Sequence, residues 1–177
     1  MDDSKKTLCK CLVAFLAFLG VLSFLLWFAL KPRSPSFSIL FISLDGNKST
    51  ISFNLEIRNP NKDSSIFYDE TTLTFLYGQD QYKVGEITIG SFHQGIKKTR
   101  DVSQVVNAQP GALKPLLNDI SNATAELNVI LMTRIRYTTF GVFKSKFHGL
   151  NLNDILPIDS NGKLSGNNNK YLLGRRS

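Results

Sequence analysis

The stretch that decides the fold is residues 51–58, which read Ile-Ser-Phe-Asn-Leu-Glu-Ile-Arg. Apolar and polar side chains alternate without a break along it. A period of two places one set on a buried face and the other towards solvent, which is typical of a half-buried β-strand. The sequence therefore predicts a strand whose core-facing residues are Ile51, Phe53, Leu55 and Ile57.

The predicted strand ends at the triplet Asn59-Pro60-Asn61. Proline fixes its φ angle and has no N–H to donate to a neighbouring strand, and asparagine side chains bond to nearby backbone in turns. We interpret the triplet as a strand-ending turn and not as a binding site.

Further short apolar segments follow at regular spacing, and one segment has helical periodicity. The predicted strands are 37–44, 66–68, 73–77, 82–89, 99–106, 125–137 and 142–152. The helical spacing of i, i+3, i+4 and i+7 is formed by Leu113, Leu116, Leu117 and Ile120, with Pro115 tolerable only in a first turn. Several short strands with one short helix predict a mainly β chain, folded as an antiparallel β-sandwich.

Towards the N-terminus, residues 11–30 contain no charged side chain. A helix of this length spans about 30 Å, the hydrocarbon thickness of a bilayer. Trp27 near one end and Lys31 just beyond it suit the membrane interface. The alternative is a cleaved secretory signal, but such an apolar region is shorter and ends in a small-x-small site. We therefore predict an uncleaved transmembrane helix.

These patterns divide the chain into a cytosolic stub at 1–10, a transmembrane helix at 11–30 and a linker at 31–36. A β-sandwich follows at 37–156, and 157–177, rich in Asn and Gly, is predicted to be a disordered tail. A short stub before a long domain suits a single-pass protein with a cytosolic N-terminus. Two N-x-Ser/Thr sequons agree with an outer domain and make Asn47 and Asn122 candidate glycosylation sites.

The net charge of the 177-residue chain is +7, and most of it follows the predicted helix. Such a domain favours anionic partners, here anionic lipid or an acidic cell-wall polymer. The only cysteines, Cys9 and Cys11, leave the domain without a disulfide. At a cytosolic membrane edge they are candidates for palmitoylation, the alternative being two small apolar side chains.

Four basic residues define a predicted anion-facing stripe: Arg134, Arg136, Lys144 and Lys146. A three-residue hairpin loop around Gly141 would place Thr138 opposite Val142. Arg136 then lies opposite Lys144, and Arg134 opposite Lys146. The other face would carry Ile135, Tyr137, Phe143 and Phe147. The alternative is a solvated charged surface, harmless because salt screens it.

The sequence offers little for catalysis. His93 and His148 are far apart and have no metal-ligand spacing, and Asp69-Glu70 would face opposite ways on a strand. No glycine-rich phosphate loop and no G-x-S-x-G elbow occurs. We expect a non-enzyme without cofactor or metal.

The ordered set of these features resembles a plant membrane family. The set is the N-terminal span, Arg58-Asn59-Pro60-Asn61, Tyr68-Asp69 and residues 92–99, Phe-His-Gln-Gly-Ile-Lys-Lys-Thr. It is similar to the harpin-induced and non-race-specific-disease-resistance-like proteins, whose outer domain is of the late-embryogenesis-abundant group 2 type, also called the water-stress and hypersensitive-response domain. The chain lacks the cysteine that relatives often place near Leu150-Asn151-Leu152.

The resemblance implies a fibronectin-like or immunoglobulin-like sandwich, plasma-membrane residence, and association with pathogen defence or abiotic stress. It implies no catalytic residues. We expect an integral membrane protein that contacts other membrane or cell-surface proteins and not nucleic acid, with the endoplasmic reticulum as an alternative location. A second reading is a lipid-handling domain, which would need an apolar cavity of several hundred Å³.

Overall fold

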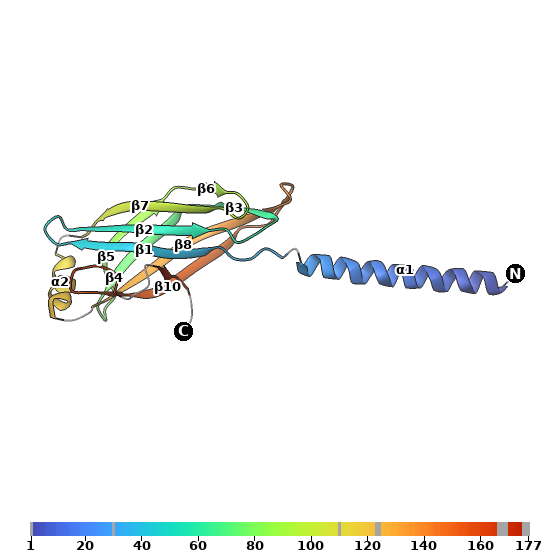
Figure 1. The fold of residues 1–177 in the computed structure, drawn as a ribbon, viewed down its shortest axis with the longest axis horizontal. Coiled ribbons are helices and arrows are strands. Elements are labelled where there is room, and N and C mark those ends of the chain that lie inside the picture. The colour runs from blue at the N-terminus through green and yellow to red at the C-terminus, as the bar shows by residue number, and fades with distance from the viewer. Residues whose placement is uncertain (1, 30, 110, 123–124, 166–169, 175–177) are drawn as a thin grey trace. The chain divides into compact units, whose positions relative to one another are not determined.

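The computed structural model describes residues 2–29, 31–109, 111–122, 125–165 and 170–174. The chain forms two compact units, residues 1–33 and residues 34–177. The first contains helix α1 and the second contains all of the strands (Figure 1).

Helix α1 (Asp2–Ala29) is one uninterrupted helix. Its segment Lys6–Leu25 is long and apolar enough to cross a membrane, and within the model none of that segment is buried. The helix begins nine residues earlier than residue 11, the start that we predicted from hydropathy. Lysines and other unbranched polar residues continue a helix easily once it is nucleated, so the stub is helical too.

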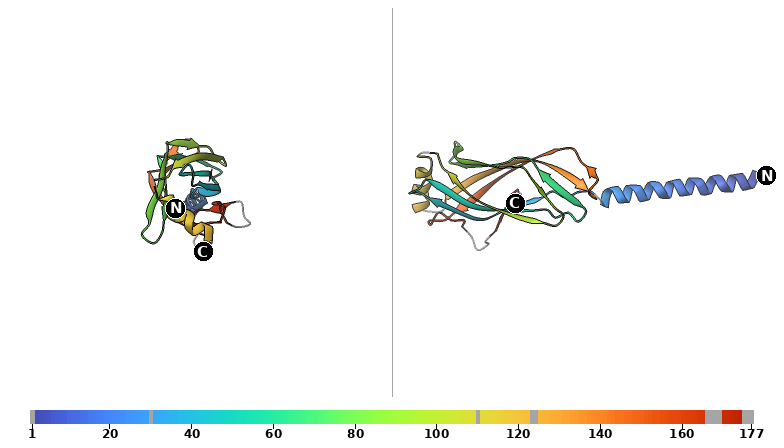
Figure 2. Two further views of the ribbon diagram at one scale, coloured as in Figure 1. Left: turned by 90° about the vertical axis from the view of Figure 1, so that its left-hand side faces the viewer. Right: turned by 90° about the horizontal axis from the view of Figure 1, so that it is seen from above.

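The second unit is an antiparallel β-sandwich, as predicted (Figures 1 and 2). The first sheet has the strand order β11-β1-β2-β7 and contains β1 (Ser36–Asp45), β2 (Thr50–Arg58), β7 (Thr99–Asn107) and β11 (Tyr171–Leu172). The second sheet contains β3 (Ser64–Tyr68), β4 (Thr71–Tyr77), β5 (Tyr82–Ile89), β6 (Phe92–Gln94), β8 (Ala125–Thr139), β9 (Phe143–Lys144) and β10 (His148–Ile158).

Strand β8 organises the second sheet because it pairs along both of its edges. One edge pairs with β4 and then with β3, and the other pairs with β10 and then with β9. Its 15 residues therefore run from one end of the sandwich, near Ala125, to the other, near Thr139.

The two sheets enclose a filled apolar core. The predicted core residues Ile51, Phe53, Leu55 and Ile57 are at most 2% exposed, which confirms the alternation of β2. Aromatic side chains meet across the sandwich: the ring centroids of Phe53 and Phe75 are 5.6 Å apart, and those of Phe37 and Tyr68 are 6.1 Å apart. Such pairs add to the stabilisation that area burial alone provides.

Helix α2 (Leu113–Asn122) forms where the periodicity predicted it, with Pro115 in its first turn. Leu113, Leu116 and Ile120 are buried against the sandwich and Leu117 is half-buried. The helix packs beside the end of the sandwich at which β8 begins (Figure 1).

The prediction of a disordered tail at 157–177 is wrong for part of the segment. Strand β10 continues to Ile158, and Leu156 and Ile158 are fully buried. The following turn is held by the carboxylate of Asp159, which accepts hydrogen bonds from the backbone of Asn161 and Lys163. The backbone N–H of Leu44 donates to the Gly162 carbonyl at 3.0 Å.

Strand β11 returns to the edge of the first sheet. Tyr171 and Leu172 pair with Ile39 and Ser38 of β1, and Leu173 is only 5% exposed. A few apolar anchors among many polar residues are enough to dock this segment, and average composition does not reveal them. Residues 166–169 and 175–177 lie outside the described part of the tail.

Candidate functional site

The triplet Asn59-Pro60-Asn61 begins directly after β2, and its first residue is fully buried. The Asn59 side-chain amide donates to the carbonyl oxygens of Ser64 at 2.9 Å and Gly95 at 3.0 Å. Its Oδ1 accepts from the backbone and side-chain N–H groups of Asn61 at 3.0 and 2.9 Å. The side chain thus joins three segments of the chain, and its hydrogen-bonding capacity is used inside the protein.

Gln94 at the end of β6 is a second buried connector, 4% exposed. Its Nε2 donates to the carbonyl oxygens of Ile57 at 2.8 Å and Lys98 at 2.9 Å. Its Oε1 accepts the hydroxyl proton of Tyr68 at 2.8 Å. Burial, and secondarily the neighbouring Tyr137, raises the pKa of Tyr68 well above its ordinary range. The phenol therefore stays protonated and serves as a permanent donor.

These contacts bring together all the domain residues that carried the family resemblance. We call Asn59, Asn61, Tyr68 and Gln94 the motif cluster. Its members bond to one another and to backbone at the end of the sandwich where β2 ends and β7 begins. The cluster supports the interpretation of Asn59-Pro60-Asn61 as a structural turn.

Sequence reasoning missed the role of Gln94. The available signal was the alternation Phe92-His93-Gln94, which places Gln94 on the same inner face as Phe92. The ring of Phe92 in turn stacks on that of Tyr68, with centroids 4.5 Å apart. A polar residue at a core-facing strand position indicates a buried hydrogen-bonding role.

Asp69 lies just outside the motif cluster, on the surface of the second sheet. The Arg134 guanidinium donates to its Oδ2 through Nε at 3.0 Å and Nη2 at 2.5 Å. These hydrogen bonds, followed by one from the backbone N–H of Glu70, lower the pKa of Asp69. Asp69 and Glu70 are therefore not a pair of carboxylates sharing a reaction site.

The hairpin register that we predicted for the basic stripe is wrong. Thr138 pairs with Lys144 and not with Val142, and further along β8 the partner of Arg134 is Gly149. The register changes between these pairs because Ser145 bonds to Tyr137 through both its backbone and its side chain.

Phe147 was expected on the inner face but lies beneath the arginines. The guanidinium carbon of Arg136 lies 4.9 Å from the centre of the Phe147 ring, and that of Arg134 lies 5.4 Å from it. Arg134 is also ion-paired with Asp69, whereas Lys144 and Lys146 are exposed. The four stripe residues thus differ in environment, and the two lysines remain the solvent-facing charges.

The candidate modification sites stand as follows. Asn47 is exposed in the turn after β1, and Cys9 and Cys11 are free and exposed on α1. Asn122 is the last residue of α2, but its side chain and Thr124 lie outside the described residues. Neither His93 nor His148 belongs to a metal site: among the described residues, no three His, Cys, Asp or Glu side chains gather closely enough to hold an ion.

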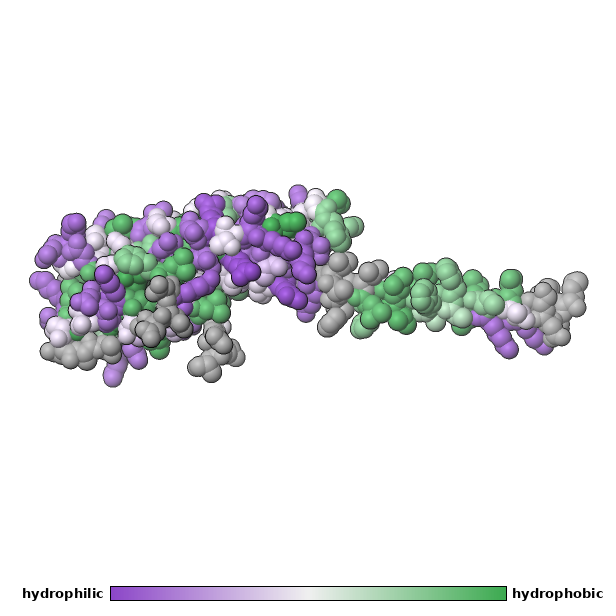
Figure 3. Space-filling model, in the orientation of Figure 1, coloured by the Kyte–Doolittle hydropathy of each residue, from purple (hydrophilic) through white to green (hydrophobic). Residues whose placement is uncertain are grey.

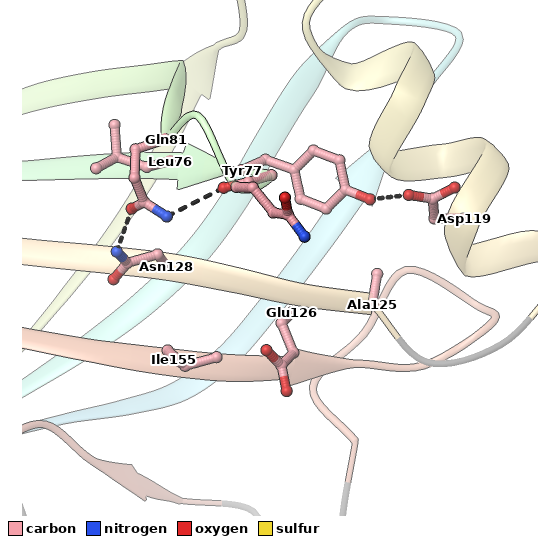
Figure 4. A pocket seen from close by; sticks show the side chains of 10 residues that line it. Leu76, Tyr77, Gln81, Asp119, Ala125, Glu126, Asn128 and Ile155 are labelled. Carbon is pink, nitrogen blue, oxygen red and sulfur yellow. Dashed lines mark hydrogen bonds between the residues drawn. The ribbon is translucent and has the colours of Figure 1, made fainter.

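A cleft of about 450 Å³ lies at the opposite end of the second sheet, between the β4–β5 turn and α2 (Figure 4). Its polar groups are paired with each other: the Tyr77 hydroxyl donates to Asp119, and Asn128 donates to Gln81. Burial, then the hydrogen bond to Asp119, raises the pKa of Tyr77 to about 12. This mixed, open lining does not resemble an acyl-chain pocket.

Comparisons with known proteins identify relatives over most of the chain, although no family model matches it. Protein NDR1 of Arabidopsis thaliana is 27% identical over 181 aligned positions, covering 90% of this chain and 79% of that protein. NDR1/HIN1-like proteins 3 and 2 of the same plant are 26% and 27% identical, covering 76% and 64% of this chain. The chain spans 63% and 52% of their respective lengths.

Among solved structures, the solution structure of AT1g01470 from Arabidopsis thaliana covers 73% of this chain and 85% of that chain. The identity is 14% and the TM-score is 0.42, so the sandwich assignment is based on the strand pairing described above and not on this likeness. The relatives, the N-terminal apolar helix and the sandwich agree with the resemblance predicted from the motif residues. The chain is a member of the NDR1/HIN1-like family.

Proposed function

We propose that this protein is a single-pass, membrane-anchored, non-catalytic interaction module that acts at the plant cell surface in defence or stress response. The observation that carries the proposal is the direct succession of an apolar helix and a filled sandwich, with β1 starting seven residues after α1 ends. The defence or stress role follows from the family resemblance.

The absence of catalysis is supported by how the candidate groups are used. The motif cluster bonds to itself and to backbone, and Asp69 is neutralised by Arg134. A general acid or base must be free to reach a proton on a substrate. None of these groups is, so the conspicuous polar residues stabilise the fold.

The proposed orientation places the N-terminus in the cytosol and the sandwich outside, at the plasma membrane, with the endoplasmic reticulum as the alternative membrane. The exposure of Asn47 in a turn supports this orientation because glycosylation needs an accessible asparagine. Its partners would be other membrane or cell-surface proteins.

Lipid handling is the competing function, and the packing of the sandwich argues against it. Phe37, Phe53, Phe75 and Tyr68 meet in the centre of the interface between the sheets, and each is at most 2% exposed. Interiors packed in this way have no room for an acyl chain without repacking.

Crosslinking in intact plant cells tests the proposal. A membrane-impermeant, lysine-reactive crosslinker should capture the full-length protein together with surface proteins, because exposed lysines such as Lys97 and Lys144 would face the reagent. The matched control is a chain in which these lysines are changed to arginine, which keeps the charge but removes the primary amine. Labelling that occurs only after the cells are permeabilised would overturn the proposed cell-surface location.

A further inference from the structure

The turn between β8 and β9 exposes large apolar side chains. The exposed fractions are 57% for Phe140, 71% for Val142 and 69% for Phe143. We call these three residues the apolar tip. Figure 3 shows apolar surface at the end of the sandwich that carries this turn. Exposed apolar patches of this kind mark sites that contact a partner or a membrane.

The backbone of the tip is held in a conformation that suits other residues better. Phe140 and Gly141 both have positive φ, at 52° and 72°, and the Val142 N–H donates to the Thr139 carbonyl at 3.2 Å. Two-residue turns with positive φ at both central positions strongly favour Asn-Gly or Asp-Gly. A bulky residue such as phenylalanine rarely adopts this region. Turn chemistry therefore does not explain Phe140.

The tip is also fixed to the body of the sandwich. The Phe140 N–H donates to the Asp63 carbonyl at 2.9 Å, and the hydroxyl groups of Ser64 and Thr139 lie 2.8 Å apart. The aromatic side chains are thus presented on a rigid support, which lowers the entropy lost when they bind.

Basic side chains surround the tip. Lys144 is the pairing partner of Thr138, and Lys62 precedes Asp63, whose carbonyl holds the tip. Lys97 lies on the neighbouring loop, since its N–H donates to the Asn61 carbonyl at 3.0 Å. All three lysines are exposed; the exposed Asp63 is an acidic neighbour. Apolar residues ringed by lysines match a bilayer interface with anionic headgroups.

The same end of the sandwich receives the chain from α1. Ser34 makes a side-chain hydrogen bond with Tyr137, two residues before Thr139. Ser34 follows the last residue of α1, Ala29, by five residues. Five residues extend at most about 17 Å. A helix that crosses a membrane would therefore hold this end of the sandwich close to the bilayer surface.

We propose that the apolar tip inserts into the interface of the membrane that α1 crosses, with Lys62, Lys97, Lys144 and Lys146 facing phospholipid headgroups. This inference depends on the membrane anchorage given under the proposed function. The four-residue basic stripe expected from the sequence is replaced by the tip and its lysine rim, because Arg134 is already ion-paired and stacked.

Quenching by brominated lipid tests the insertion in the full chain. Trp27 is the only tryptophan, so Trp27→Phe gives a silent background for a reporter, Phe143→Trp. The protein is reconstituted in phosphatidylcholine vesicles containing phosphatidylglycerol, with or without bromine on the acyl chains. We expect a blue-shifted emission that loses intensity with the brominated lipid.

The matched control is Tyr82→Trp in the same background. Tyr82 is 65% exposed and lies at the opposite end of the second sheet, because Tyr77, its pairing partner, pairs with Leu127 near the start of β8. Its emission should be unaffected by bromine. Quenching at neither position, or equally at both, would overturn the proposal.

A second variant separates folding from membrane contact. Phe140→Asn places the preferred residue in the turn, so the melting temperature should stay equal or rise while the quenching of the Phe143→Trp reporter decreases. Unchanged quenching would contradict a role for Phe140. If the parent protein does not float with the vesicles, the anchorage itself fails. Flotation without quenching contradicts the tip proposal alone.

Discussion

The Tyr68 hydroxyl donates a 2.8 Å hydrogen bond to Oε1 of Gln94, and both side chains are buried. The two residues belong to separate parts of the family resemblance, Tyr68-Asp69 and residues 92–99. Together with Asn59 they explain why this set of residues occurs together: each satisfies polar groups that strand ends and loops would otherwise leave buried and unpaired. The resemblance is thus a signature of the fold.

Removing the Tyr68 hydroxyl should destabilise the domain measurably. In Tyr68→Phe the Gln94 Oε1 loses its donor, and a buried polar atom without a partner costs about 1–3 kcal/mol. Thermal unfolding of the sandwich should show a lower melting temperature. Tyr82→Phe is the matched control, since Tyr82 is 65% exposed and its loss should have no effect. Equal melting temperatures for the parent and Tyr68→Phe would contradict the proposed role of this bond.

Asn59→Asp should be more damaging although it hardly changes shape. The substitution replaces the two N–H donors that reach Ser64 and Gly95 with an oxygen acceptor, so acceptors would face each other in a buried site. We expect a loss of several kcal/mol, since burial of an unpaired charge is among the largest effects of single substitutions. Urea unfolding of Asn59→Asp and of Asn107→Asp, an exposed control, measures the difference. Similar losses in both would show that burial of Asn59 is unimportant.

Phe53→Ala tests the core that the alternating strand predicted. Phe53 is 2% exposed and packs on Phe75, so truncation should cost about 3–5 kcal/mol. Domains of this size have about 5–15 kcal/mol of stability, so yield of folded protein should decrease too. Phe41→Ala on the same sheet removes the same atoms from a residue that is 45% exposed. It should cost much less, and equal costs would place Phe53 outside the core.

The ion pair of Asp69 and Arg134 should contribute to stability in a pH-dependent way. Hydrogen bonds from Arg134, then from the Glu70 backbone, hold the pKa of Asp69 below its ordinary value of 3.8. A lowered folded-state pKa gives stability that is present above the unfolded pKa and lost as pH decreases through the folded pKa. The contribution is small because the pair is exposed.

Unfolding free energies of the parent and Arg134→Gln, compared along a series of acidic pH values, check this prediction. The parent should be the more stable protein near neutral pH, and the difference should vanish in acid. A difference that does not change with pH would assign the effect of Arg134 to its stacking on Phe147 instead.

The sequence predicted elements with a regular pattern well and irregular contacts poorly. Strand β2 and helix α2 follow periodicities that extend over their whole length, so their buried faces were predictable from Phe53 and Leu116 outward. The hairpin register was not, because the two bonds between Ser145 and Tyr137 shift the pairing without any change in the alternation.

The candidate site was only partly predictable for a similar reason. The residues of the motif cluster were recognisable in the sequence, but their contacts join positions up to 36 residues apart, as between Asn59 and Gly95. The docking of the tail depends on a single buried side chain, Leu173, within a polar segment. Neither long-range contacts nor isolated anchors produce a local periodic signal.

The central claim is that α1 crosses a membrane and leaves the sandwich on the outer side. The most direct measurement is glycosylation at Asn47 in full-length protein expressed in plant cells, compared with Asn47→Gln, Asn122→Gln and the double variant. We expect the parent to migrate more slowly than the double variant and its N-terminus to be protected from protease in intact cells. Identical migration of all four proteins, with the N-terminus cleaved from outside, would contradict the claim.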